Sequence, residues 1–93
     1  MRYVICYDIA DDGRRDDVAT LLSGYGPRVQ LSVFECEFRS REEFLALLGK
    51  LRSLVEPLED QVRAYPLDAA ASRSAIVVGA RTLEERQDFW IVR

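Results

Sequence analysis

The segment of residues 3–9, YVICYDI, constrains the fold more than any other part of this sequence. Six of its seven residues are apolar or aromatic, and the seventh is Asp8. A run this short, rich in residues that suit a pleated backbone, is typical of a central strand buried on both faces. Because side chains alternate along a strand, Asp8 shares one face with Val4 and Cys6, and the larger odd-numbered side chains share the other.

Asp8 stands at the carboxyl end of this strand, where functional sites are common in sheets. Asp11, Asp12 and Gly13 follow at once and end the strand. The strand alone leaves two interpretations open: Asp8 starts the turn, or its carboxylate belongs to a site.

A helix is predicted next, because apolar residues recur at positions 18, 21, 22 and 25. Asp11 or Asp12 caps it, and Gly24, Gly26 and Pro27 end it. Arg14 and Arg15 lie near its amino end, close in sequence to Asp8. Arginines in such a place are solvated, paired with neighbouring aspartates, or available to a ligand.

Residues 28–38 form a strand region with a defect. Apolar residues occupy odd positions up to Val33 and even positions from Phe34 onward. A strand cannot keep one face buried through such a change without a bulge or a break. We therefore predict two short strands broken around residues 31–33, with the hydroxyl of Ser32 in the kink available to local backbone or to a ligand.

The second half of the chain begins with a capping box, Ser40 to Glu43, which opens an amphipathic helix that closes near Pro57 and Asp60. Residues 61–67 are a predicted strand, and Pro66 indicates a sheet edge or a strand end. Residues 68–74 are small and polar, typical of a loop or hinge. A short strand at 75–79, a helical turn at 82–85 and a strand at 88–93 complete the prediction.

This order, β-α-β-β-α-β with a tail, predicts an α+β ferredoxin-like domain spanning residues 1–93, with a core at 1–79 and an extension at 80–93. Both helices should cover the sheet face that carries the larger side chains. Asp8 would then face away from them, on a face that a second copy of the chain could cover. In such a homodimer two Asp8 carboxylates could approach each other near the twofold axis.

Composition narrows the chemistry. The chain has no histidine, which excludes histidine general bases and Ser-His or Cys-His catalysis. Any metal would be held by oxygen ligands, which favours magnesium or manganese. The net charge of −3 argues against a surface covered in basic side chains that bind nucleic acid. All cationic side chains except Lys50 are arginine, whose guanidinium group fits phosphate.

The location that we expect is the cytoplasm. No run approaches a membrane span, and the amino terminus does not resemble a signal peptide. Cys6 and Cys36 are expected to be reduced core residues.

Several segments, taken in order, resemble the small CRISPR-associated adaptation protein family known as Cas2. They are Tyr7-Asp8-Ile9, Arg14-Arg15, Tyr25-Gly26, residues 28–35 (RVQLSVFE) and residues 62–67 (VRAYPL). The resemblance covers about two thirds of the chain. It implies a ferredoxin-like homodimer whose terminal strand pairs with the partner's sheet. It also implies a partnership with the CRISPR integrase, Cas1, in spacer acquisition, and a magnesium-dependent endonuclease acting on RNA or duplex DNA.

The resemblance also implies roles for individual residues. Asp8 would bind the metal, and Asp8, Tyr7 and Ser32 would be catalytic. The nucleic acid would be held by Arg14 or Arg15, Arg28 and Phe34. Three residues stand where the family often has basic ones, so they reduce the positive charge of the expected nucleic-acid surface. They are Leu31, Asp16 and Asp17.

Two other functions compete with the nuclease. The dimer could be a scaffold that spaces integrase dimers and supports DNA through arginines without chemistry. The chain could instead be a small regulatory ligand-binding domain of the same topology, which predicts a glycine-rich ligand loop that the sequence lacks.

Overall fold

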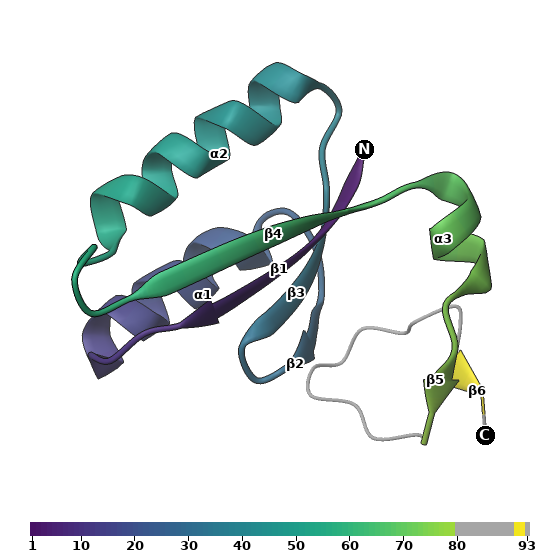
Figure 1. Cartoon of the computed structure of the whole chain (residues 1–93), viewed down its shortest axis with the longest axis horizontal. Coiled ribbons are helices and arrows are strands. Elements are labelled where there is room, and N and C mark those ends of the chain that lie inside the picture. The colour runs from purple at the N-terminus through teal and green to yellow at the C-terminus, as the bar shows by residue number, and fades with distance from the viewer. Residues whose placement is uncertain (80–90, 93) are drawn as a thin grey trace.

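The computed structural model describes residues 1–79 and 91–92. Its elements follow the predicted order, and Figure 1 shows them along the chain. They are β1 (Arg2–Asp8), α1 (Asp12–Ser23), β2 (Arg28–Gln30), β3 (Val33–Glu37), α2 (Arg41–Leu54), β4 (Gln61–Leu67), α3 (Ala69–Ser74), β5 (Val77–Val78) and β6 (Ile91–Val92). None of the described helices is long and apolar enough to cross a membrane.

The main sheet has the strand order β2-β3-β1-β4, so β1 lies inside it as predicted. Both neighbours of β1 are antiparallel to it. Val4 lies between Glu35 of β3 and Tyr65 of β4, and Asp8 lies opposite Gln61. Because cross-strand partners share a face, Gln61 and Tyr65 lie on the same face as Asp8.

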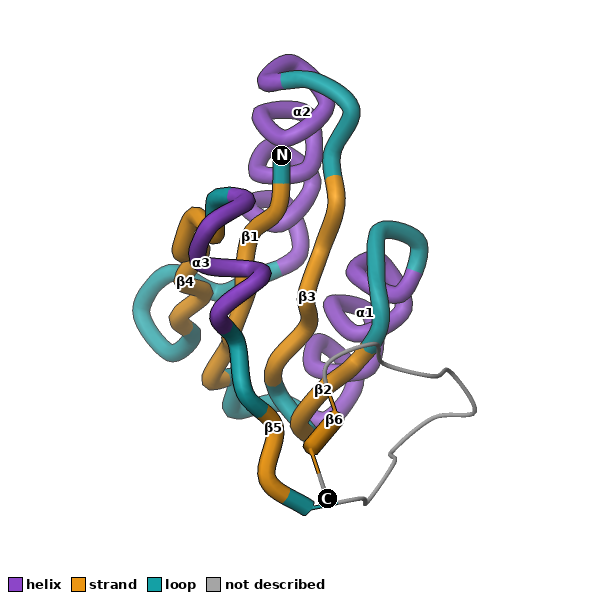
Figure 2. Tube along the Cα trace, turned by 90° about the vertical axis from the view of Figure 1, so that its right-hand side faces the viewer, coloured by secondary structure: helices purple, strands orange, loops and turns teal. Residues whose placement is uncertain are grey.

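Helices α1 and α2 cover one face of this sheet, and the core lies between them and the strands (Figures 1 and 2). The alternation predicted for β1 is confirmed, because Ile5 and Tyr7 are buried while Asp8 is exposed. The buried apolar residues come from every layer and are Ile5, Tyr7, Ile9, Val18, Ala19, Leu22, Phe34, Cys36, Phe38, Phe44, Leu47 and Leu51.

The predicted break between the second and third strands is present. β2 and β3 pair antiparallel, and their register shifts between Arg28 and Gln30. The shift lets Phe34 turn into the core although Val33 precedes it, which resolves the phase change in the sequence. Leu31 and Ser32 form the turn between these strands, as expected from the position of the kink.

Both long helices begin at the predicted caps. Asp11 caps α1 and accepts a hydrogen bond from the backbone N–H of Arg14 at 2.9 Å. Ser40 caps α2 and accepts from the N–H of Glu43 at 3.2 Å. The Glu43 carboxylate reaches back to the N–H of Arg39 at 2.8 Å, one residue further than a standard capping box requires.

The prediction of a loop or hinge at residues 68–74 is wrong, because α3 occupies Ala69–Ser74. Three successive alanines favour a helix, and Asp68 caps it by accepting from the N–H of Ala71 at 2.8 Å. Small residues are common in loops, but alanine is also the strongest helix former, and here the alanines decide the structure.

The tail is described in part. β5 is shorter than the strand predicted at 75–79, and it pairs in parallel with β6 of the same chain. Figure 2 places this pair beyond α3, away from the open β4 edge. The helical turn predicted at 82–85 lies outside the described residues. Pairing of the extension with a partner's sheet stays a prediction.

Candidate functional site

Asp8 is the last residue of β1, and its side chain is exposed on the sheet face opposite the helices. Its position follows from the alternation of the strand, because the apolar side chains of Ile5 and Tyr7 fix which face turns inward. Asp8 therefore presents a carboxylate to solvent at the end of a rigid element. This is the placement that the sequence predicted for a site.

Tyr7 points the other way and is only 7% exposed. Its hydroxyl donates to the carbonyl oxygen of Leu31 at 3.3 Å, and its backbone N–H donates to the carbonyl of Ser32 at 3.1 Å. Tyr7 thus holds the turn at residues 31–32 against β1 and brings Ser32 next to the strand end that carries Asp8. This geometry favours a positioning role for Tyr7 over the direct catalytic role that we expected.

Two arginines surround the Tyr7 hydroxyl. Burial raises the pKa of Tyr7, while the nearby positive charges of Arg28 and Arg15 oppose that rise. The Arg28 guanidinium lies 5.3 Å from the centre of the Phe34 ring, in a cation–π arrangement. The structure therefore gathers Tyr7, Ser32, Arg15 and Arg28 at the Asp8 end of the sheet, although they come from three different parts of the chain.

Phe34 is a correction to the sequence prediction. The expected contact with nucleic acid is impossible for a side chain that is 0% exposed and packed in the core. The ring contributes indirectly, because its face supports Arg28.

Arg14 is engaged within the fold, and its contact with nucleic acid stays a prediction. Its Nε donates to Oδ2 of Asp60 at 2.8 Å, and Nη2 lies 3.3 Å from Oδ1 of the same carboxylate. The side chain of Asp60 is fully buried by these contacts. Arg14 therefore belongs to an ion pair with Asp60, whereas Arg15 contacts the Ile9 carbonyl and Asp12 and is the more exposed of the two, at 41% against 29%.

Sequence reasoning missed Asp60 and Arg63. Asp60 was interpreted only as the end of a helix, because its partners Ala10 and Arg14 are distant in sequence. Arg63 lies on the Asp8 face, where its Nε donates to Gln61 Oε1 at 3.0 Å and its Nη1 donates to the Tyr65 hydroxyl at 3.1 Å. The alternation of polar residues in β4 was the available signal, since Gln61 is the direct partner of Asp8.

One copy of the chain does not hold a complete metal site in its described part, because no group of three or more carboxylate, cysteine or histidine ligands occurs there. Asp8 alone supplies two oxygen atoms to an exposed position. Magnesium commonly takes one or two protein carboxylates and keeps several waters. The donor chemistry at Asp8 therefore fits magnesium, with the remaining ligands supplied by water, by substrate phosphate or by a carboxylate of a second molecule.

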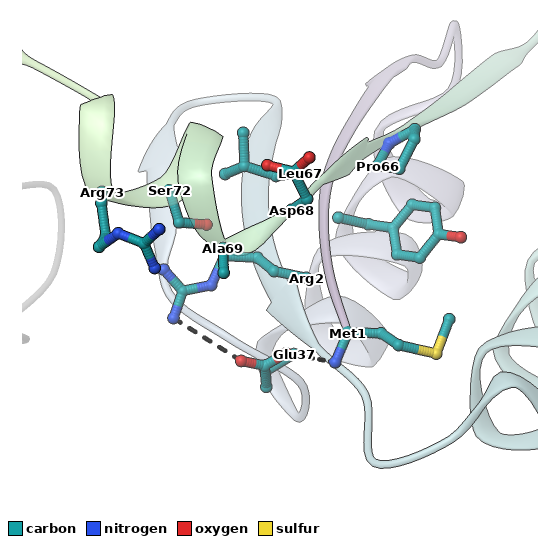
Figure 3. A pocket seen from close by; sticks show the side chains of 10 residues that line it. Met1, Arg2, Glu37, Pro66, Leu67, Asp68, Ala69, Ser72 and Arg73 are labelled. Carbon is teal, nitrogen blue, oxygen red and sulfur yellow. Dashed lines mark ion pairs between the residues drawn. The ribbon is translucent and has the colours of Figure 1, made fainter.

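A pocket of about 520 Å³ lies at the opposite end of β1, among Met1, Arg2, Pro66 and Arg73 (Figure 3). Two of its cations pair with Glu37. The Met1 amine lies 2.9 Å from Glu37, and Arg2 lies 3.8 Å from the same carboxylate. Because Arg2 and Asp8 are at opposite ends of the strand, this pocket is separate from the candidate site.

The fold and the Asp8 site together define a class: small ferredoxin-like domains with a carboxylate at the exposed end of the central strand. Residues 1–75 match the family model described as CRISPR associated protein Cas2. A crystal structure of Cas2 from Streptococcus pyogenes superimposes with a TM-score of 0.76 at 31% identity, covering 85% of this chain and all of the other. The chain belongs to the Cas2 family.

Curated relatives agree with this assignment. A protein of Chloroflexus aurantiacus named CRISPR-associated endoribonuclease Cas2 3 is 46% identical over 82% of this chain and 81% of its own length. A protein of the same name from Synechocystis is 54% identical over 70% of each chain. A solved structure titled as a partial Cas6-RT-Cas1–Cas2 complex contains a chain with a TM-score of 0.70 and 32% identity, covering 80% of both chains.

Proposed function

We propose that this chain is a homodimeric, magnesium-dependent endonuclease that cleaves phosphodiester bonds in single-stranded RNA or duplex DNA and acts with the Cas1 integrase in spacer acquisition. The observation that carries the nuclease is Asp8, an exposed carboxylate at the end of the central strand. The names of the relatives, endoribonuclease and endonuclease, support the reaction class. The similarity to a chain in a Cas1–Cas2 complex supports the integrase as partner.

Two copies of Asp8 would hold the metal. In the proposed dimer the sheet faces that carry Asp8 meet, so that the two carboxylates approach the twofold axis. Unit charges 4 Å apart repel by about 4 kcal/mol at an effective dielectric constant near 20, which favours uptake of a cation between them. Magnesium or manganese, when bound there, would lower the pKa of a water and stabilise the charge that develops on the phosphate.

Other side chains would position the nucleic acid. Arg15 and Arg28 carry the positive charge nearest the Tyr7 hydroxyl, and arginine pairs well with phosphate oxygens. Ser32, in the turn that Tyr7 holds, could donate a hydrogen bond to a neighbouring phosphate. Tyr7 acts through this turn as a positioning residue.

The nuclease is tested by comparing wild-type protein with Asp8→Ala on RNA and DNA substrates in the presence of magnesium. Loss of Asp8 should abolish cleavage without unfolding the dimer, because the side chain is exposed and supports no packing. Asp17→Ala is the matched control, since it removes another exposed aspartate from α1. Cleavage that persists in Asp8→Ala would reject the proposed active site.

A non-catalytic scaffold is the second candidate, and it is favoured by the lack of a complete ligand set within the described part of one chain. It predicts that Asp8→Ala leaves spacer acquisition intact, whereas deletion of residues 89–93 abolishes it. A spacer-acquisition assay in cells with both variants distinguishes the two functions. Loss of acquisition in Asp8→Ala together with tolerance of the deletion would reject the scaffold.

A further inference from the structure

A single peptide group, between Ile9 and Ala10, is held at both of its polar ends by side chains. The carbonyl oxygen of Ile9 accepts from Nε and Nη2 of Arg15, at 3.3 Å and 3.1 Å. The N–H of Ala10 donates to Oδ1 of Asp60 at 3.0 Å. This peptide group comes one residue after Asp8, in the connection between β1 and the cap of α1.

We call these interactions of Asp60 and Arg15 with the peptide group the clamp. Both of its side chains make further interactions that hold them in place. The Asp60 carboxylate also accepts from Arg14 Nε at 2.8 Å and from the N–H of Glu56 at 2.8 Å. Its side chain has no exposed surface. On the other side, Arg15 Nη1 donates to Asp12 at 2.6 Å. Each half of the clamp is therefore fixed by a second interaction. Arg15 holds the carbonyl end of the peptide group directly, and Arg14 holds the N–H end through Asp60.

The position of the clamp matters because strand pairing stops at Asp8. Asp8 is the last residue of β1 paired with β4, and Ile9 and Ala10 belong to no helix or strand. The Ile9 side chain is only 4% exposed, and its burial anchors residue 9 of the connection. Orientation of the next peptide plane still needs hydrogen bonds, because backbone outside regular structure is otherwise free to rotate.

We propose that Asp60 is a positioning residue for the Asp8 site: with Arg14 and Arg15 it locks the Ile9–Ala10 peptide group and so fixes the direction in which Asp8 presents its carboxylate. The proposal rests on the proposed nuclease function. The Asp60 carboxylate is enclosed by Arg14 and by the N–H groups of Ala10 and Glu56, so it would act through the backbone. Positioning errors of this kind reduce turnover more than substrate binding, because the ground-state contacts to nucleic acid remain.

The test compares Asp60→Asn with Glu59→Gln. Asp60→Asn keeps the size of the side chain and removes the charge that holds Arg14. Glu59→Gln makes the same change on an adjacent carboxylate that is 57% exposed and lies 3.7 Å from Arg14. Both proteins are studied as purified full-length dimers, with circular dichroism and gel filtration to confirm that they are folded.

Two measurements decide the proposal. Amide hydrogen exchange at Ala10, followed by NMR, should be about tenfold faster in Asp60→Asn, as expected for a weakened hydrogen bond. Magnesium-dependent cleavage should fall about tenfold in kcat with little change in KM. Glu59→Gln should match the wild type in both. Unchanged Ala10 exchange, or unchanged kcat in Asp60→Asn, would overturn the positioning role.

The two proposals fail in different ways. A wild-type protein that cleaves neither RNA nor DNA rejects the nuclease, whatever Asp60 does. The exchange rate at Ala10 then supports or rejects the clamp on its own, because that measurement needs no substrate. Conversely, active wild-type protein with an equally active Asp60→Asn variant rejects the clamp and leaves the nuclease in place.

Discussion

Two aspartates beside the connection between β1 and α1 have opposite surroundings. Asp8 is exposed and shares its face with Gln61 and Arg63. Asp60 is enclosed by hydrogen-bond donors from Ala10, Arg14 and Glu56. Hydrogen bonds from Arg14, followed by those from the two backbone amides, hold the pKa of Asp60 down at about 2. One aspartate is thus available for chemistry, and the other is committed to structure.

The low pKa of Asp60 predicts how stability depends on pH. A carboxylate whose pKa is lower in the folded state than in the unfolded state stabilises the protein at pH values above the unfolded-state pKa, which is 3.8 for Asp60. This contribution is lost as the pH falls toward the folded-state pKa of about 2. The free energy of unfolding of the wild type should therefore drop between pH 4 and pH 2. The charged groups that face Asp60 are Arg14, with Glu59 beside it.

Urea unfolding at several pH values, on wild type and Asp60→Asn, measures this contribution. The difference in stability between the two proteins should be constant above pH 4 and shrink below it, since Asn cannot titrate. A difference that stays constant down to pH 2 would show that the pKa of Asp60 is the same in the folded and the unfolded protein.

At the scale of elements, the turn between α1 and β2 shows a constraint that local sequence patterns hide. Gly24 ends α1 with φ of −73°, so it needs no special backbone conformation. Gly26 has a different role, because a Cβ atom there would lie 1.8 Å from the carbonyl oxygen of Glu35. The backbone of this turn packs directly on β3, which donates from Glu35 N–H to the Pro27 carbonyl at 3.0 Å.

Two glycine substitutions should therefore have opposite effects. Gly26→Ala should destabilise the protein by roughly 3 kcal/mol, because the turn must move away from β3 and lose its hydrogen bonds. Gly49→Ala should stabilise it by about 0.5–1 kcal/mol, since Gly49 lies within α2 and an added Cβ meets nothing within 4 Å. Thermal and denaturant unfolding measure both. Equal stabilities for the two variants would contradict the close approach at Gly26.

At the scale of the whole molecule, α1 and α2 cover one face of the main sheet and leave the face that carries Asp8 without a long helix in the described chain (Figures 1 and 2). Val4 and Cys6 are half-buried there, and Tyr65 is 48% exposed. An apolar strip in the middle of an open sheet is typical of a surface that another molecule covers. The proposed homodimer would cover it with the same face of a second copy, which also brings the two Asp8 residues together.

A charge in the middle of this face should separate the subunits. Val4→Lys should raise the dimer dissociation constant by about 100-fold or more, because a buried unpaired ammonium is costly at an interface. Glu35 lies directly opposite Val4, so the separated monomer should tolerate the lysine. Leu58→Lys is the control, since Leu58 is 94% exposed and lies outside the sheet. Light scattering on both variants gives the result, and a Val4→Lys protein that remains dimeric would reject this interface.

The amino-acid sequence by itself determined the order of the main-sheet elements and the sheet face on which Asp8 lies. Alternation in β1, the caps Asp11 and Ser40, and the change of phase before Phe34 are local patterns, and local patterns are set by backbone geometry that short segments already contain. The helix at Ala69–Ser74 was within reach of the same reasoning and was missed.

Only the tertiary structure decided which arginine does what. Arg14 and Arg15 are neighbours in sequence, yet one binds Asp60, 46 positions away, and the other binds the carbonyl of Ile9. Their environments differ because packing of β4 against β1 brings the buried Asp60 to one side of the connection and leaves the other side to Arg15. Such contacts depend on the meeting of distant segments, which no local spacing encodes.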